Sequence, residues 1–136
     1  MEEYELLALD YGTKKGKADV LECVKEQLAV LEDALKSDLF LSKLKQTQKD
    51  AFFAFATRCN LIAAEAGAEF SLAVHSDTNE ASAVMTVGSL ELGESMMAIL
   101  SDALYLSDFF TVEPIEEKGS KLAIYFHYLF SRVIKS

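Results

Sequence analysis

Apolar residues recur at helical spacing in two long stretches in the first half of the chain. The first stretch runs from Asp19, a suitable N-cap, to about Lys36. Its large apolar residues are spaced by three and four positions, which places them on one seam of a helix. They are Leu21, Val24, Leu28, Leu31 and Leu35. A seam of two heptads favours packing in a helical hairpin over a free-standing coiled coil.

A second helix is predicted to follow the first. Ser37 or Asp38 suits the cap of a short helical turn, and Thr47 followed by Asp50 forms a weaker version of a capping box. Gly67 is well placed to end this helix. The apolar residues that recur on its one face are Phe52, Phe55, Ala56, Cys59, Ile62, Ala63 and Ala66. We therefore expect two antiparallel helices with facing apolar stripes.

The hydrophobic period changes after Gly67. Phe70, Leu72 and Val74 alternate with more polar residues, which is typical of a strand. Residues 77–80 have the composition of a turn, and residues 82–87 are predicted to form the returning strand. This segment is expected to be a β-hairpin.

The last third of the chain is predicted to add a helix over 92–106 and a second hairpin, with strands over 109–115 and 121–130. Residues 121–130 also fit a helix, but their β-branched and aromatic residues favour a strand. Pro114 has no backbone N–H to donate, so its strand should lie at a sheet edge or end there.

These elements predict a two-layer α+β domain. In it, an N-terminal helical hairpin and one later helix pack on an antiparallel sheet of about four strands, in the order ααββαββ. Residues 4–11 fit a short strand, but their pattern is not decisive enough to be counted. No linker or internal repeat interrupts the order, so residues 1–136 are expected to form a single domain.

The charge balance bears on the partners of this domain. The 136 residues include 22 acids and 13 bases, for a net charge of −9, and 51% are hydrophobic. This composition excludes a disordered chain and argues against nucleic acid as a partner. From Glu65 to Glu117 the chain holds no lysine or arginine. Such a stretch is either an ordinary solvated surface or an acidic surface that attracts a basic protein partner.

The same sequence favours a cytoplasmic protein. The first residues are acidic where a secretory signal would be basic, and no apolar run approaches the ~18 residues that a membrane span requires. The two cysteines, Cys23 and Cys59, lie on apolar helical stripes and do not form a disulfide framework. We expect no membrane association.

The candidate functional residues lie on the second face of the predicted sheet. If the helices cover Phe70, Leu72 and Val74, then the histidines His75 and His127 point to the opposite side. Tyr125 and Glu113 are expected beside them. This surface is an ordinary half-exposed face, a homodimer interface marked by an exposed aromatic, or a site where two histidines and a carboxylate hold a metal.

No catalytic motif or metal-binding spacing supports the last alternative, and no cofactor is expected. The sequence therefore predicts a non-catalytic protein-interaction or binding module that forms a homodimer. The alternative is a small metal-dependent hydrolase or ligand-sensing domain that uses the His/Glu/Tyr sheet face.

Overall fold

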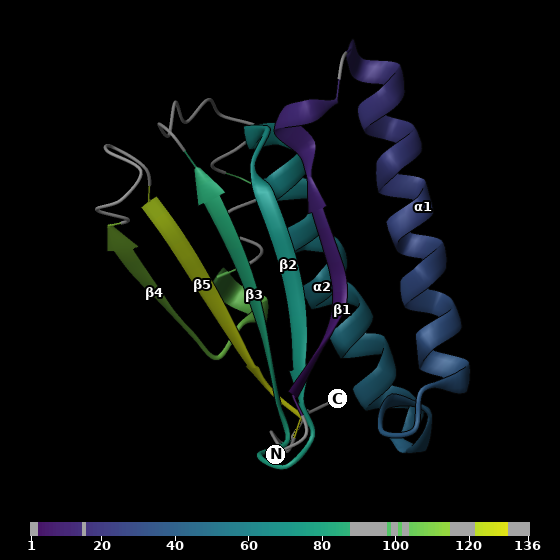
Figure 1. Ribbon diagram of the computed structural model, residues 1–136. Coiled ribbons are helices and arrows are strands. Elements are labelled where there is room, and N and C mark those ends of the chain that lie inside the picture. The colour runs from purple at the N-terminus through teal and green to yellow at the C-terminus, as the bar shows by residue number, and fades with distance from the viewer. Residues whose placement is uncertain are drawn as a thin grey trace.

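The computed structural model describes residues 3–14, 16–87, 98, 101, 104–114 and 122–130. Its strands pair antiparallel throughout and form one five-stranded sheet in the order β1-β2-β3-β5-β4 (Figure 1). The elements are β1 (Glu3–Asp10), the 3-10 turn η1 (Tyr11–Thr13), α1 (Gly16–Ser37), the 3-10 turn η2 (Leu41–Lys43), α2 (Gln46–Ala66), β2 (Glu69–His75), β3 (Glu80–Val87), β4 (Phe109–Pro114) and β5 (Leu122–Leu129).

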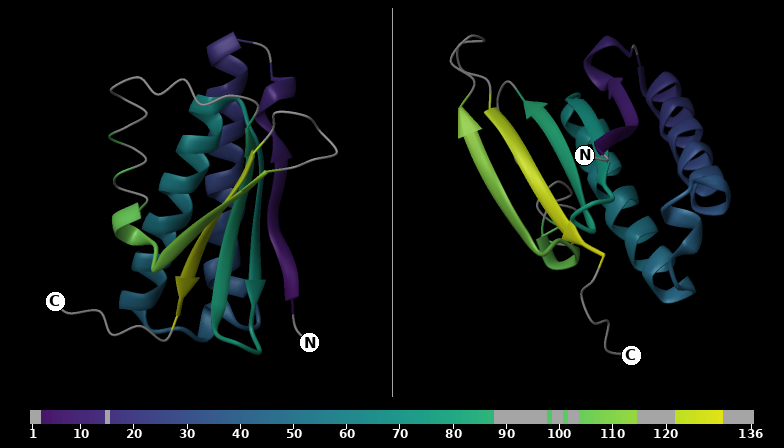
Figure 2. Two further views of the ribbon diagram at one scale, coloured as in Figure 1. Left: turned by 90° about the vertical axis from the view of Figure 1, so that its left-hand side faces the viewer. Right: turned by 60° about the horizontal axis from the view of Figure 1, so that its bottom comes forward.

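Helices α1 and α2 lie on one side of the sheet (Figure 2), which confirms the predicted two-layer α+β fold with an N-terminal helical hairpin. The predicted number of strands was too small, because β1 precedes the hairpin and pairs with β2. The register of this pairing shifts between Glu5 and Leu7. Such a bulge breaks the alternation of side chains, so β1 shows an apolar run over residues 6–9 where a regular strand would alternate.

The core lies between the sheet and α2. Phe70, Leu72 and Val74 point to the helical side and are buried, as the alternating pattern predicted. Aromatic rings from α2 and the end of β5 pack together there, with centroids 4.9 Å apart for Phe52 and Phe130 and 5.1 Å apart for Phe55 and Tyr128. Edge-to-face and tilted contacts of this kind stabilise the core beyond the burial of area alone.

The start of the hairpin differs from its prediction. Helix α1 begins at Gly16, which has a positive φ of 80°, so Asp19 lies in the first turn and is not the N-cap. Val24 and Leu31 of the predicted seam are buried, whereas Leu21 is exposed. Leu21 belongs to the first turns of α1, which extend past the end of β1 (Figure 1).

Of the two residues predicted to cap the turn between the helices, Asp38 binds its backbone: Asp38 Oδ1 accepts hydrogen bonds from the N–H groups of Phe40, the N-cap residue of η2, and Leu41, both at 2.9 Å. The start of α2 differs from its prediction, because Lys45 and not Thr47 is the N-cap residue. Helix α2 begins at Gln46, and the N–H of Lys45 donates to Oε1 of Gln48 at 3.0 Å. The predicted helix end at Gly67 is confirmed by its left-handed conformation, with φ 63°.

The second half of the sheet follows the predicted strands. Strand β3 begins at Glu80, slightly earlier than predicted, and residues 122–129 are a strand and not a helix. Strand β4 is an edge strand and ends at Pro114. The predicted helix over 92–106 falls largely outside the described residues. Of those described, 98, 101 and 104–106 are helical, and Leu104 and Leu106 pack against the core.

No helix among the described residues is long and apolar enough to cross a membrane.

Candidate functional site

The face of the sheet that points away from α1 and α2 carries the candidate residues. We call it the open face; in Figure 1 β1 and β2 pass in front of α2 and turn this face toward the viewer. Strand pairing assigns to it alternate residues of every strand. Its polar and aromatic residues are Glu3, Glu5, Asp10, Glu69, Ser71, His75, Glu80, Ser82, Thr86, Thr111, Glu113, Tyr125 and His127.

The two histidines flank one residue of the strand between them. Ser82 of β3 pairs with His127 of β5. On the β2 side it pairs with Ala73, which is two residues before His75 on the same face. His75 Nε2 lies 3.0 Å from Ser82 Oγ, and His75 Nδ1 lies 3.8 Å from Glu3 Oε2. The imidazole of His75 therefore connects β1, β2 and β3 across this face.

His127 is paired differently. Its ring stacks on that of Tyr125, with centroids 6.5 Å apart and an angle of 17° between the planes. The two residues are two positions apart on β5 and so project from the same side of the strand. They form a flat, half-buried surface at the side of the open face that borders β4.

Glu113 does not join this group. It stands opposite Ala123, whereas His127 lies four positions further along β5. That separation is about 13 Å along the strand. The structure thus brings His127 and Tyr125 together, places His75 on β2 with β3 between it and them, and leaves Glu113 apart. The carboxylates near His75 are those of Glu3 and of Glu80, its partner in the register.

Within the described part of the chain, no three histidine, cysteine, aspartate or glutamate side chains are grouped closely enough to hold a metal ion.

A hollow opens at the other end of this face, where β1, β2 and β3 lie side by side. Its volume is about 330 Å³, and its floor includes Ala8 and Val84. The carboxylates of Glu5, Asp10 and Glu69 line it. The bulge after Glu5 lies in the same stretch of β1. The hollow is therefore an acidic depression with an apolar floor, which suits the alkyl stem and charged head of a lysine or arginine side chain.

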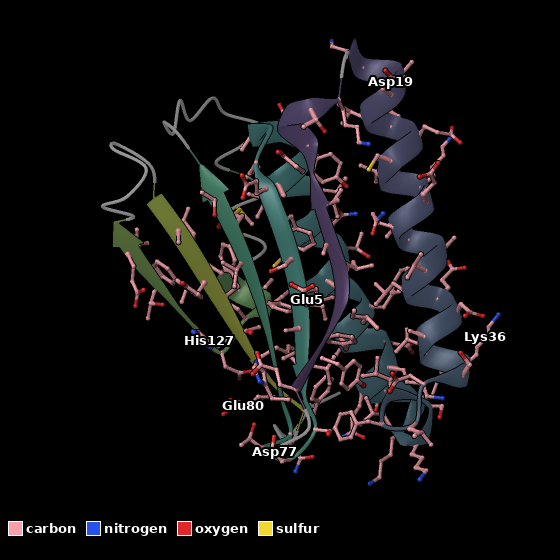
Figure 3. All side chains as sticks on the ribbon, in the orientation of Figure 1. Glu5, Asp19, Lys36, Asp77, Glu80 and His127 are labelled. Atoms are coloured by element: carbon pink, nitrogen blue, oxygen red, sulfur yellow. The ribbon has the colours of Figure 1, made fainter. Side chains whose placement is uncertain are left out.

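The open face carries all the carboxylates of the sheet. These are Glu3, Glu5, Asp10, Glu69, Glu80 and Glu113, and none of the residues of the five described strands is a lysine or an arginine. Figure 3 labels Glu5 and Glu80 on these strands together with His127. Because the potential of such a surface is the sum of its charges, the open face attracts cations and repels anions.

Sequence reasoning missed the hollow because its residues come together only through the pairing of β1 with β2. Asp10 and Glu69 are opposite each other in the register, although they are far apart in the chain. By contrast, Ser82 could have been placed beside His75. A short turn over 76–79 fixes the register of the β2–β3 hairpin.

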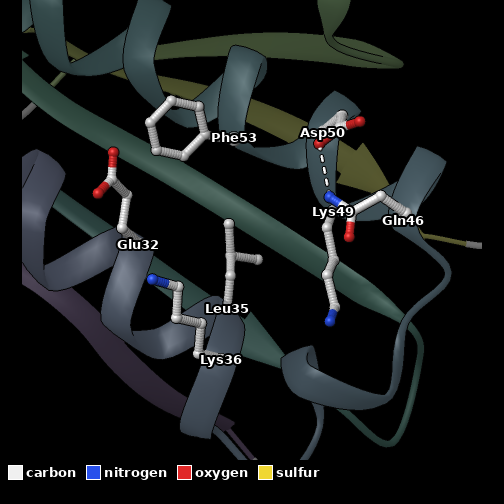
Figure 4. Close-up of a pocket in the computed structure, with 7 residues that line it drawn as sticks. All are labelled: Glu32, Leu35, Lys36, Gln46, Lys49, Asp50 and Phe53. Atoms are coloured by element: carbon white, nitrogen blue, oxygen red, sulfur yellow. Dashed lines mark hydrogen bonds between the residues drawn. The ribbon is translucent and has the colours of Figure 1, made fainter.

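A second depression lies between α1 and α2, on the outside of the hairpin (Figure 4). Its volume is about 310 Å³, and Leu35 and Phe53 form its apolar part. Four charged side chains surround them, two acidic and two basic, and Gln46 Nε2 donates a hydrogen bond to Asp50 Oδ1 at 2.9 Å. With balanced charges, this groove selects no particular sign of ligand. The complete lining is Glu32, Leu35, Lys36, Gln46, Lys49, Asp50 and Phe53.

The cysteines are buried in the helical layer, as their positions predicted. Burial raises the pKa of the Cys59 thiol well above its ordinary value, which keeps the thiol protonated and unreactive near neutral pH. Cys23 lies close to the buried phenol of Tyr11, whose hydroxyl donates to Asn60 Oδ1. Desolvation raises the pKa of this phenol too, so Tyr11 is a neutral hydrogen-bond donor.

A scan against models of protein families and a search of curated proteins found no match to this chain.

Proposed function

We propose that the protein is a non-catalytic, cytoplasmic binding module that self-associates, and that its open face binds a basic segment of a partner protein. The single observation that carries the proposal is the distribution of charge over the sheet. Six carboxylates share one face of five strands that contain no lysine or arginine. A surface of one sign selects a partner of the opposite sign and speeds its encounter.

The shape of the open face supports the same proposal. The hollow beside Glu5, Asp10 and Glu69 provides a place for one long basic side chain. Further along the sheet, the stacked pair of Tyr125 and His127 offers a flat aromatic surface on which a second cationic side chain can lie. An extended segment with spaced lysines or arginines would contact both.

The experiment is a titration of the protein into a fluorescein-labelled peptide of alternating lysine and serine, followed by fluorescence anisotropy. A peptide with glutamate in place of lysine is the control. We expect the lysine peptide to bind and the glutamate peptide not to bind. Raising the salt from 50 to 300 mM should weaken binding, because exposed charge pairs are screened beyond about one Debye length.

Paired variants locate the binding surface. The double variant E5Q/E69Q neutralises two carboxylates of the hollow, and E22Q/E26Q neutralises two exposed carboxylates on α1. Both variants change the net charge equally. We expect the first to weaken peptide binding about tenfold, which corresponds to roughly 0.7 kcal/mol for each exposed pair, and the second to have little effect. Equal losses in the two variants, or no binding by the unmodified protein, would overturn the proposal.

A further inference from the structure

Strand β4 is the last strand on its side of the sheet. Among the described residues it pairs only with β5, so alternate backbone N–H and C=O groups of residues 109–114 point away from the sheet. Figure 1 and Figure 2 show β4 as the outermost strand on its side. An edge of this kind is a template on which another strand adds by main-chain hydrogen bonds.

Two apolar side chains of β4 are exposed on one side of the strand. Phe110 and Val112 point to the helical side of β4, and each is 48% exposed. On the helical side of β2, by contrast, Phe70, Leu72 and Val74 are buried. Tyr105, in the short helix just before β4, is 85% exposed. Phe110 and Val112 are two positions apart on the same side of β4, and an exposed apolar pair of this kind indicates an association surface.

The charges decide which surface joins two copies of the chain. If two open faces met, each would bring six carboxylates and no lysine or arginine against the same set, and like charges opposed in this way repel strongly. The sequence-based expectation of a homodimer through the face of Tyr125 is therefore disfavoured. The β4 edge carries one carboxylate, that of Glu113, which points to the open face.

We infer that a second copy of this chain adds to the β4 edge, so that two sheets join into one across a two-fold axis. This inference rests on the self-association that is part of the proposed function. It leaves both open faces uncovered and on the same side of the joined sheet. A partner protein could then contact two acidic hollows at once, which increases its avidity.

The two-fold axis and the residues of β4 define the register. Opposite residues of antiparallel strands point to the same side, so Phe110 can face Phe110 or Val112 of the other copy. The register centred on Thr111 pairs all of residues 109–113 and leaves Pro114 outside, where its missing N–H is not needed. In this register, Phe110 of each copy stands opposite Val112 of the other, and the two Thr111 residues face each other.

The first test measures mass by sedimentation equilibrium from low to high micromolar concentration. We expect the unmodified chain to reach twice the monomer mass. V112K places a charged side chain on the edge, and V30K places the same residue at a matched position on α1, where Val30 is 47% exposed. V112K should weaken association at least about tenfold and V30K should leave it unchanged, because lysine on an edge strand blocks strand addition.

The second test checks the register with single cysteines, since Cys23 and Cys59 are buried. Two cysteines at position 111 would be about 4.5–5.5 Å apart between Cα atoms, within the range of a disulfide. Two cysteines at position 113 would be about 13 Å apart along the strands. With oxidised glutathione as the oxidant, we expect T111C to form a covalent dimer on a non-reducing gel and E113C not to do so.

The outcomes separate the inference from the proposed function. A dimer that V112K does not weaken, or that E113C links as readily as T111C, would contradict the β4 interface while leaving self-association intact. A monomer at all concentrations would overturn both self-association and this inference, whereas the peptide titration would still test the open face. A chain that stays monomeric but binds extended peptides at β4 would identify the edge as a peptide site and refute pairing between copies.

Discussion

The two edges of the sheet are built in opposite ways. Strand β1 is bulged, and Glu3, Glu5 and Asp10 place three carboxylates along it. Leu7 is buried beneath the helices, and Tyr4 Oη donates a hydrogen bond to Asp38 Oδ1 at 2.7 Å, which ties this edge to the helical layer. Strand β4 shows no register shift in its pairing, and Phe110 and Val112 are half exposed.

The difference shows how one sheet can protect one edge and leave the other available. A bulge, a row of like charges and a covering helix each prevent a further strand from adding to β1. Among the described residues, the devices that protect β4 are its terminal Pro114 and the carboxylate of Glu113. We therefore expect changes at β1 to affect folding stability, and changes at β4 to affect association.

The largest expected effect comes from Leu7. L7A leaves a cavity under β1 and should lower the free energy of unfolding by about 3 kcal/mol, whereas V112A on β4 should lower it by less than about 1 kcal/mol. Urea denaturation at a protein concentration below the association midpoint measures both. If the two variants lose equal stability, the two edges are equally buried in solution and the contrast between them fails.

The next effect tests the end of β1, where Tyr11 is buried against Asn60. Among the described residues, Asn60 Nδ2 is buried without a hydrogen-bond partner, so Y11F would leave the whole amide unpaired. We expect a loss of about 2 kcal/mol in urea denaturation. The double variant Y11F/N60L removes both polar groups and should lose less than Y11F alone. A larger loss in the double variant would mean that Asn60 contributes mainly by its shape.

The alkaline limit of stability should depend on the same tyrosine. Because burial raises the pKa of Tyr11, the unfolded chain releases this proton near pH 10 while the folded chain retains it. The contribution of Tyr11 to the free energy of unfolding should therefore be constant below pH 9 and fall above pH 10, by roughly 1 kcal/mol per pH unit. Measured from pH 8 to 11, Y11F should show a shallower decline than the unmodified protein. Parallel declines would place the alkaline sensitivity elsewhere, with the buried Cys59 as the next candidate.

The sequence predicted most of the regular elements because their patterns are local. The β2–β3 hairpin, the end of α2 at Gly67 and the edge position of β4 at Pro114 follow from alternation, a glycine cap and a missing N–H. Strand β1 could not be recognised with the same assurance. Its bulge removes the alternation, and its partner β2 is separated from it by the whole helical hairpin.

The candidate site also has features that local patterns predict and features that depend on long-range strand pairing. That His75, His127 and Tyr125 would share a face could be predicted from alternation within two strands. That Glu113 would lie apart from His127 could not, because the register of β4 with β5 depends on the connection between them. The acidic hollow also depends on a long-range pairing, between Asp10 of β1 and Glu69 of β2.

The smallest expected effects compare two aspartates, one at each edge. Asp10 Oδ1 accepts a hydrogen bond from the N–H of Gly12 at 2.8 Å, and Asp108 Oδ2 accepts one from the N–H of Leu129 at 2.6 Å. Both bonds are exposed, so D10A and D108A should each lower the free energy of unfolding by about 1 kcal/mol or less. Hydrogen exchange distinguishes them: D10A should speed exchange of the amide of Gly12, and D108A that of Leu129.

Since Asp108 directly precedes β4, D108A should also weaken association by fraying the edge on which the second copy adds, whereas D10A should leave the mass distribution unchanged. Equal effects on association would mean that global stability, and not the order of β4, controls the dimer.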